Sequence, residues 1–134
     1  MRCVASLIAI SLFTIVSLFA QGDRGSITGT IADPAGAVVA NAAVASDKDT
    51  LVFLNIEGVH LSQQGYADSI HEEGFAPLKE LIENFVKANG KIFVCAPCFK
   101  KRKLDEGKLI AGAAVVGGAK LVEFMSDNCP SVSY

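Results

Sequence analysis

The fold of this chain is decided by the stretch Lys91-Ile92-Phe93-Val94-Cys95-Ala96-Pro97-Cys98, which is followed directly by Phe99-Lys100-Lys101-Arg102-Lys103. The apolar, β-prone residues at its start predict a strand that ends near the first cysteine. The two cysteines have C-x-x-C spacing. Proline suits the first turn of a helix because its φ is already helical, so a helix is predicted to begin at Pro97 or just after it. The sequence therefore predicts a strand that delivers two thiols to a turn.

The two thiols are the first candidates for chemistry. A helix N-terminus and neighbouring Lys or Arg charges favour thiolate over thiol, and the thiolate is the reactive form. We expect a moderately lowered pKa for Cys95, and greater reactivity than at Cys98, although burial acts in the opposite direction. Cys98 is either a second thiol that closes a disulfide with Cys95 or a bystander on the next turn. The alternative for Cys95 is a passive, small core residue.

Length and charge bound the possible functions. The chain has 134 residues, 51% of them hydrophobic, which suffices for one modest core and no more than one complete domain. Its net charge of -2 creates no global field toward nucleic acid or anionic lipid. The basic run lacks an aromatic stacking platform, so no nucleic-acid partner is predicted. The four cysteines are too few and too unevenly spread for a disulfide-stapled miniprotein: Cys3, Cys95, Cys98 and Cys129.

The N-terminal segment predicts export. Residues 1–20 carry one charge, at Arg2, and are otherwise rich in Leu, Ile, Val, Phe and Ala, which is the layout of a secretory signal peptide. The apolar run is also long enough to approach a membrane span, so an uncleaved anchor is the alternative. We therefore expect a periplasmic or membrane-anchored protein. A cytoplasmic chain with an apolar start is the other interpretation.

Residues 21–44 predict a β-hairpin. Residues 25–31 alternate like a strand, Asp33-Pro34-Ala35-Gly36 suits a turn, and residues 37–39 form the predicted return strand. The segment resembles the opening of carboxypeptidase-regulatory-like β-sandwich repeats, of which only the first strands would be present. An isolated hairpin is marginal in water, so it is expected to dock on its neighbour.

The remainder, residues 45–134, predicts one α/β domain. Residues 51–56 form a nearly continuous apolar run, as in a strand that is buried on both faces of a parallel sheet. Residues 75–86 have apolar side chains at helical spacing, with Asn89-Gly90 as the stop signal. A short strand over residues 113–116, a helix over 117–127 and a closing strand over 131–134 follow. We predict a three-layer α/β/α fold with a mostly parallel sheet.

The connection over residues 57–74 is expected at the carboxyl edge of the sheet, where ligands of open α/β proteins collect. Five of its side chains are candidates to reach the thiols, although a solvated loop is the simpler interpretation: His60, Tyr66, Asp68, His71 and Glu72. The C-x-x-C pair with Cys129 and either histidine is a candidate zinc site. A structural zinc site usually shows a second tight ligand pair, so no metal or other cofactor is predicted.

Several stretches of residues 45–134 resemble the DsrE/DsrF-like family of small α/β sulfur-transfer proteins. They are Val52-Phe53-Leu54 leading to Glu57-Gly58-Val59, Gly65-Tyr66-Ala67-Asp68, Phe75-Ala76-Pro77-Leu78-Lys79-Glu80-Leu81, and Val94-Cys95-Ala96-Pro97-Cys98-Phe99-Lys100-Lys101-Arg102. The resemblance implies a cysteine at a strand end that accepts sulfur as a persulfide and passes it on within a relay. It also implies homo- or hetero-oligomers with sulfur donor and acceptor proteins. By position, Cys95 matches the family's cysteine.

One departure from the family pattern shapes the remaining expectations. Family members normally begin with a strand and a helix ahead of residue 45, and this unit is expected to be absent here. Its loss would expose a sheet edge, which predicts dimerisation or aggregation. The function predicted is a sulfur relay. The alternative is a non-catalytic interaction protein or export-targeted remnant, whose cysteines form a disulfide or bind zinc.

Overall fold

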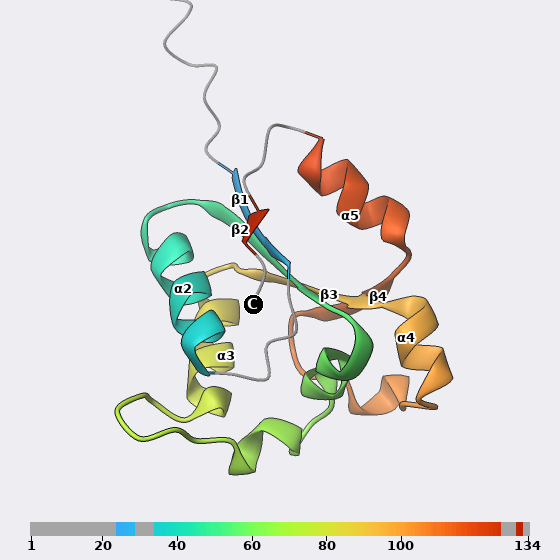
Figure 1. Ribbon diagram of the computed structural model, residues 1–134, viewed down its shortest axis with the longest axis horizontal. Helices are drawn as coiled ribbons and strands as arrows, with labels where there is room; N and C mark the ends of the chain where they lie inside the picture. Colours follow the sequence, from blue (N-terminus) through green and yellow to red (C-terminus); the bar gives the residue numbers. More distant parts are fainter. Residues whose placement is uncertain (1–23, 29–33, 127–130, 133–134) are drawn as a thin grey trace, which may run out of the picture.

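A parallel β-sheet forms the centre of the computed structural model, which describes residues 24–28, 34–126 and 131–132 (Figure 1). The described strands pair in the order β4-β3-β2-β1-β5, and all four pairings are parallel. Their bounds are Arg24–Thr28 (β1), Asp49–Leu54 (β2), Lys91–Cys95 (β3), Ala113–Val116 (β4) and Ser131–Val132 (β5). The predicted mostly parallel sheet is confirmed.

Helices cover both faces of this sheet, so the described residues form three layers. Figure 1 shows α2 and α3 on one face, and α4 and α5 on the other. The helices span Pro34–Ala45 (α2), Leu78–Lys87 (α3), Ala96–Lys101 (α4) and Gly118–Met125 (α5). Three short 3-10 helices lie in the connections: Ile56–Ser62 (η2), Tyr66–Ser69 (η3) and Glu106–Lys108 (η4). The predicted α/β/α class is confirmed.

Strand β2 is buried on both faces, as its continuous apolar run predicts. Every side chain from Thr50 to Leu54 is at most 5% exposed. β2 lies between β1 and β3, so the backbone groups along both of its edges are paired. A strand in this position has no solvent-facing side, which explains why the apolar pattern does not alternate.

Helix α3 buries its apolar stripe and ends at the predicted stop signal. Leu78 is fully buried and Phe85 is 3% exposed. Asn89 adopts a left-handed φ of 66°, and the Gly90 N–H donates to the Phe85 carbonyl at 2.9 Å. These are features of a Schellman motif, which satisfies carbonyls at the helix end. α3 therefore returns the chain to the start of β3.

The predicted β-hairpin over residues 21–44 is wrong. β1 pairs with β2 in parallel register, Ser26 opposite Leu51, and residues 34–45 form helix α2 instead of a turn and a return strand. Three small side chains face the core from α2, because they recur at helical spacing: Ala37, Ala40 and Val44 are 4%, 1% and 9% exposed. Asn41 Nδ2 also donates to the Leu81 carbonyl of α3 at 2.9 Å. Packing against α3 and the sheet therefore stabilises the helical conformation of these residues over the predicted hairpin.

This correction changes the expected domain boundary. The first strand and helix, expected to be absent, are present as β1 and α2, so the sheet begins at Arg24 and not after residue 45. β1 covers the edge of β2, which removes the reason given above for expecting association. The predicted export signal over residues 1–20 lies outside the described residues, as does Cys129. Within the described ranges, no helix has the length and apolarity needed to cross a membrane.

The packing between α3 and β3 predicts that Gly90→Ala destabilises the protein. A Cβ at position 90 would lie 2.4 to 2.5 Å from three ring atoms of Phe85, which is itself buried and unable to move away. We expect a loss of about 1–3 kcal/mol in the free energy of unfolding, the usual cost of overpacking. Urea unfolding followed by circular dichroism measures it.

Gly118→Ala is the matched control. A Cβ at position 118, the first residue of α5, meets no atom within 4 Å. Alanine in an unstrained helical position should be neutral or stabilise by about 0.4–1 kcal/mol. Equal unfolding midpoints for the two variants would contradict the packing described here.

Candidate functional site

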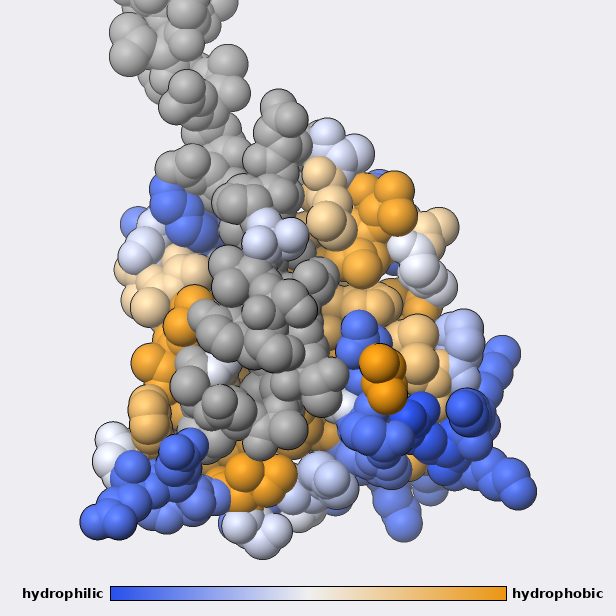
Figure 2. All heavy atoms as spheres, in the orientation of Figure 1, coloured by the Kyte–Doolittle hydropathy of each residue, from blue (hydrophilic) through white to orange (hydrophobic). Residues whose placement is uncertain are grey.

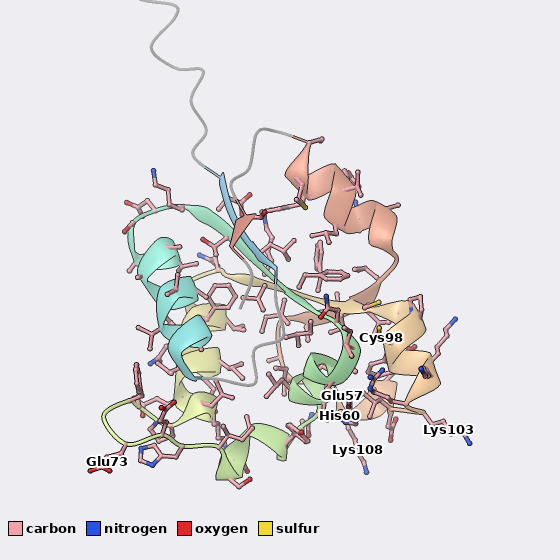
Figure 3. The ribbon with its side chains drawn as sticks, in the orientation of Figure 1. Glu57, His60, Glu73, Cys98, Lys103 and Lys108 are labelled. Atoms are coloured by element: carbon pink, nitrogen blue, oxygen red, sulfur yellow. The ribbon has the colours of Figure 1, made fainter. Side chains whose placement is uncertain are left out.

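The two thiols lie where β3 passes into α4. β3 ends at Cys95, α4 begins at Ala96, and Pro97 lies in the first turn of the helix. Both cysteines are free thiols and both are partly exposed. Figure 3 shows Cys98 on α4, on the same side of the molecule as Glu57 and His60 of η2. The predicted strand-to-helix junction is confirmed.

Cys98 receives the contacts that stabilise a thiolate. The pKa of Cys98 is held below its ordinary value, first by a hydrogen bond from the Cys95 thiol and then, against the effect of burial, by the backbone N–H of Ile56. That N–H lies 3.4 Å from the Cys98 Sγ. The positive charges of Arg102 and Lys101 act in the same direction. Opposite charge and donated hydrogen bonds both favour the ionised sulfur.

The pKa of Cys95 is raised, in the direction opposite to that of Cys98. Burial raises the pKa of the Cys95 thiol, and the neighbouring Cys98 sulfur adds to the effect because a second negative charge beside the first is unfavourable. The expectation of a lowered pKa at Cys95 is therefore wrong, and the lowered pKa is at Cys98. Its physical reason is position: Cys95 remains at the end of an apolar strand, while Cys98 faces Ile56 and Arg102.

The Ile56 backbone is an unexpected part of this site. Ile56 has a φ of 45°, a left-handed conformation that is a genuine outlier for a β-branched residue. Its side chain is 59% exposed, so the core does not hold it there. The conformation directs the N–H toward Cys98. No signal in the sequence marks this residue, because its type argues against a left-handed backbone.

Arg102 and Glu57 connect the thiols to η2. Arg102 Nη2 pairs with Glu57 Oε1, which lowers the pKa of Glu57 and raises that of Arg102. Arg102 Nη1 also donates to the Cys98 carbonyl at 3.3 Å. His60 Nε2 lies 3.5 Å from Glu57 Oε2, and its ring stacks on that of Tyr66 with centroids 5.4 Å apart. Glu57 and Arg102 were not predicted as site residues, although Arg102 stands four residues after Cys98, one helical turn on.

Three other candidates from residues 57–74 are not brought to the thiols. Asp68 pairs with Lys79 at 3.1 Å, and His71 Nε2 lies 3.1 Å from the Phe75 carbonyl. Glu72 precedes Glu73, which Figure 3 shows at the opposite end of the molecule from Cys98. Within the described ranges, no three His, Cys, Asp or Glu side chains are grouped so as to hold a metal ion. Cys129, a candidate zinc ligand, lies outside them.

Fold and site define a small three-layer α/β protein with a thiol pair at the carboxyl edge of a parallel sheet. A sequence model of the DsrE/DsrF-like family matches residues 18–130 of the chain, which therefore belongs to that family. The match begins well ahead of residue 45, where the resemblance in the sequence was expected to start, and it includes β1 and α2.

Two solved structures share this fold. The YchN protein of E. coli superposes with a TM-score of 0.68 at 16% sequence identity, over 83% of this chain and 99% of that one. A protein of unknown function from Methanobacterium thermoautotrophicum superposes with a TM-score of 0.62 at 12% identity, over 84% and 99% of the two chains. No curated protein sequence matches the chain. At these identities, the structures establish the fold.

The pKa order predicts how the thiols react with an alkylating reagent. Only the thiolate reacts. As the pH is raised, the alkylation rate at Cys98 should therefore begin to increase at a lower pH than the alkylation rate at Cys95. Arg102→Gln removes a cation that favours the Cys98 thiolate, so the Cys98 curve should move to higher pH. Mass spectrometry of protein alkylated at a series of pH values measures both curves.

Lys100→Gln is the matched control, since it removes one positive charge two residues earlier in the chain. The Lys100 charge is not among the causes of the Cys98 shift, so the Cys98 curve should stay in place. If alkylation of Cys95 instead rises at a lower pH than alkylation of Cys98, the assignment of the lower pKa to Cys98 is wrong.

Proposed function

We propose that this protein is a sulfur-relay protein, in which the Cys98 thiolate accepts sulfane sulfur and passes it to the thiol of a partner protein. The observation that carries the proposal is the hydrogen bond from the strained Ile56 amide to Cys98 Sγ. Together with the Cys95 thiol and Arg102, it favours one ionised sulfur in a partly exposed position. Membership of the DsrE/DsrF-like family supports sulfur relay as the kind of function.

The transfer needs no external oxidant or reductant. The Cys98 thiolate attacks the terminal sulfur of a donor persulfide; a new S–S bond forms, the donor's S–S bond breaks, and the donor leaves as a thiolate. Cys98 is then a persulfide. In the second step, an acceptor thiolate attacks its terminal sulfur and restores the Cys98 thiolate. Each step is a thiolate attack on divalent sulfur, so its rate depends on the thiolate fraction.

Cys95 has a supporting role in this proposal. Its raised pKa keeps the proton on Cys95, where it can be donated to the Cys98 sulfur. In a competing reaction, Cys95 attacks the inner sulfur of the Cys98 persulfide. That attack forms a Cys95–Cys98 disulfide and releases hydrosulfide. The raised pKa of Cys95 disfavours this loss, because only the thiolate attacks.

Loading of the reduced protein tests the proposal. After exposure to a low-molecular-weight persulfide, wild type and Cys95→Ser should each gain one sulfur atom by intact mass, and Cys98→Ser should not. Loaded protein mixed with a thiol acceptor should return to its original mass. Cys129→Ser is the control for reaction at a third thiol, and it should load as wild type does.

Two results would contradict the proposal. Loading that is lost in Cys95→Ser and kept in Cys98→Ser would assign the carrier to the position that the family resemblance implied. Failure of every variant to load, with a stoichiometric disulfide or bound zinc in the untagged protein, would favour the non-catalytic alternative.

A further inference from the structure

We propose that four lysines beside the thiols form a docking surface for an acidic protein segment that surrounds the acceptor cysteine. The lysine surface is defined by Lys100 and Lys101 of α4, Lys103 just after it, and Lys108 of η4. All four side chains are exposed. The inference deepens the proposed function, on which it rests, by naming the chemistry of the partner.

The lysine surface differs from the other lysines in its lack of ion pairs. Elsewhere in the described residues, four lysines pair with carboxylates: Lys79 with Asp68 at 3.1 Å, Lys87 with Glu83 at 3.7 Å, Lys91 with Asp49 at 2.5 Å, and Lys120 with Glu123 at 2.8 Å. No such pair involves a lysine of the lysine surface within the described part of the chain. Positive charge is thus left uncompensated at one place.

Nearby carboxylates offset only part of the charge of this surface and form no ion pair with its lysines in the described residues. Asp105 Oδ1 accepts a hydrogen bond from the Gly107 N–H at 2.8 Å, within its own turn, and Glu106 forms no ion pair with a lysine of the described residues. Glu57 is engaged by Arg102. The lysine surface therefore keeps a net positive charge, which an acidic segment of another molecule would match.

The surface adjoins the reacting sulfur. Lys101 is close enough to lower the pKa of Cys98. Figure 3 shows Lys103 and Lys108 extending outward on the side of the molecule that carries Cys98, and Figure 2 shows hydrophilic residues gathered over α4 and the segment after it. A molecule that touches these lysines therefore approaches Cys98 from the same side of the protein.

The backbone that presents the lysines is held in place. Lys103 has a left-handed φ of 52°, its N–H donates to the Lys100 carbonyl at 3.0 Å, and the Leu104 N–H donates to the Phe99 carbonyl at 3.3 Å. This is the helix-ending arrangement also found after α3. Phe99 is buried, which anchors the turn on the core. Less conformational entropy is then lost when a partner binds.

An exposed apolar side chain completes the surface and favours a protein as the occupant. The side chain of Ile56 is 59% exposed. Because the backbone N–H of Ile56 contacts Cys98, this residue lies beside the thiols. An apolar centre with a charged rim is the usual composition of a protein interface. Single-stranded nucleic acid would call for several aromatic stacking platforms. The exposed aromatic ring near Glu57, that of Tyr66, already stacks on His60, and the exposed side chain of Ile56 is aliphatic.

Acidic residues around the acceptor cysteine would also make transfer selective. Free in solution, they raise the pKa of that cysteine, because like charge disfavours a thiolate. Docked on the lysine surface, they are neutralised, and the acceptor thiolate forms beside the Cys98 persulfide. Transfer is then favoured only within the complex.

The test uses three short peptides with one cysteine each, flanked by aspartates, serines or lysines, and activated as mixed disulfides with thionitrobenzoate. The Cys98 thiolate attacks the peptide sulfur, the S–S bond breaks, and coloured thionitrobenzoate leaves. At low salt we expect the aspartate peptide to react about tenfold faster than the serine peptide, and the lysine peptide to react most slowly. The differences should shrink as salt screens the charges.

Charge reversal provides the matched comparison. The triple variant Lys100→Glu, Lys103→Glu and Lys108→Glu should reverse the order of the peptides; Lys101 is spared because it acts on the Cys98 pKa. The control Lys79→Glu, Lys87→Glu and Lys120→Glu changes charge equally but elsewhere, and it should keep the order. If the triple variant does not fold, the salt dependence of the wild-type rates decides instead.

Two outcomes would overturn the docking surface: equal rates for the three peptides, or an order of rates that both triple variants keep. If equal peptide rates are accompanied by lysine-dependent binding to a single-stranded oligonucleotide or to phosphatidylglycerol vesicles, the occupant is that molecule and not an acidic protein segment. The exchange reaction needs no sulfane sulfur. A protein that loads sulfur but ignores peptide charge therefore refutes only this inference. A protein that shows the charge order but never loads refutes only the proposed function.

Discussion

The site depends on the parallel register between β2 and β3. Leu54, the last residue of β2, lies opposite Val94, one residue before the end of β3. The two chains therefore leave the sheet at the same edge and side by side, which is the general property of parallel strands that creates binding sites there. Ile56 follows the first strand and Cys98 follows the second, so the amide of one reaches the sulfur of the other. The alternating burial of β3 fixes this register, because a one-residue shift would turn the buried Ile92 and Val94 to the other face of the sheet.

Strain at Ile56 is supported by the packing that follows it. A left-handed β-branched residue costs of order 1–3 kcal/mol, and it persists only where its surroundings determine it. Here, the surroundings are the buried end of β2 on one side and η2 on the other, where Val59 is fully buried and Leu61 is 3% exposed. The backbone between these anchors has little freedom. The donor to Cys98 is thus held in place before any sulfur is bound, which is what preorganised stabilisation of a charged group requires.

Polarity is divided sharply within a few residues of the thiols. Arg102 forms an ion pair with Glu57 and donates a hydrogen bond to the Cys98 carbonyl, so its charge is used within the site. The lysines on either side of it in the sequence face solvent and have no partner of this kind in the described residues. One basic run in the sequence therefore has two structural roles. Arginine suits the inner position because its planar group can hold two acceptors at once.

The sequence by itself determined the elements whose patterns are strong. Three features were predicted: the apolar run of β2, the amphipathic stripe and stop of α3, and the placement of Cys95 at the end of β3 with Cys98 just beyond it. Burial produces a regular pattern of apolar residues along the sequence, which makes such elements predictable. The β-hairpin predicted over residues 21–44 is wrong, because its return strand and most of its turn fall within α2. Residues 34–45 are small, and α2 has no strong amphipathic stripe, although their many alanines and Pro34 at the first helical position were signals for a helix.

Only the tertiary structure decided which thiol ionises first. Cys95 and Cys98 have the same chemistry and the same basic neighbours in sequence. Their pKa values diverge first because the Cys95 thiol donates a hydrogen bond to the Cys98 sulfur, whereas burial raises the pKa of Cys95. The Ile56 amide, 42 positions away in the chain, adds a second hydrogen bond to Cys98 alone. Electrostatic effects of this kind depend on distances of a few ångströms across the fold. Those distances are set only when the chain has folded and the strands are in register, so the order of the residues does not give them.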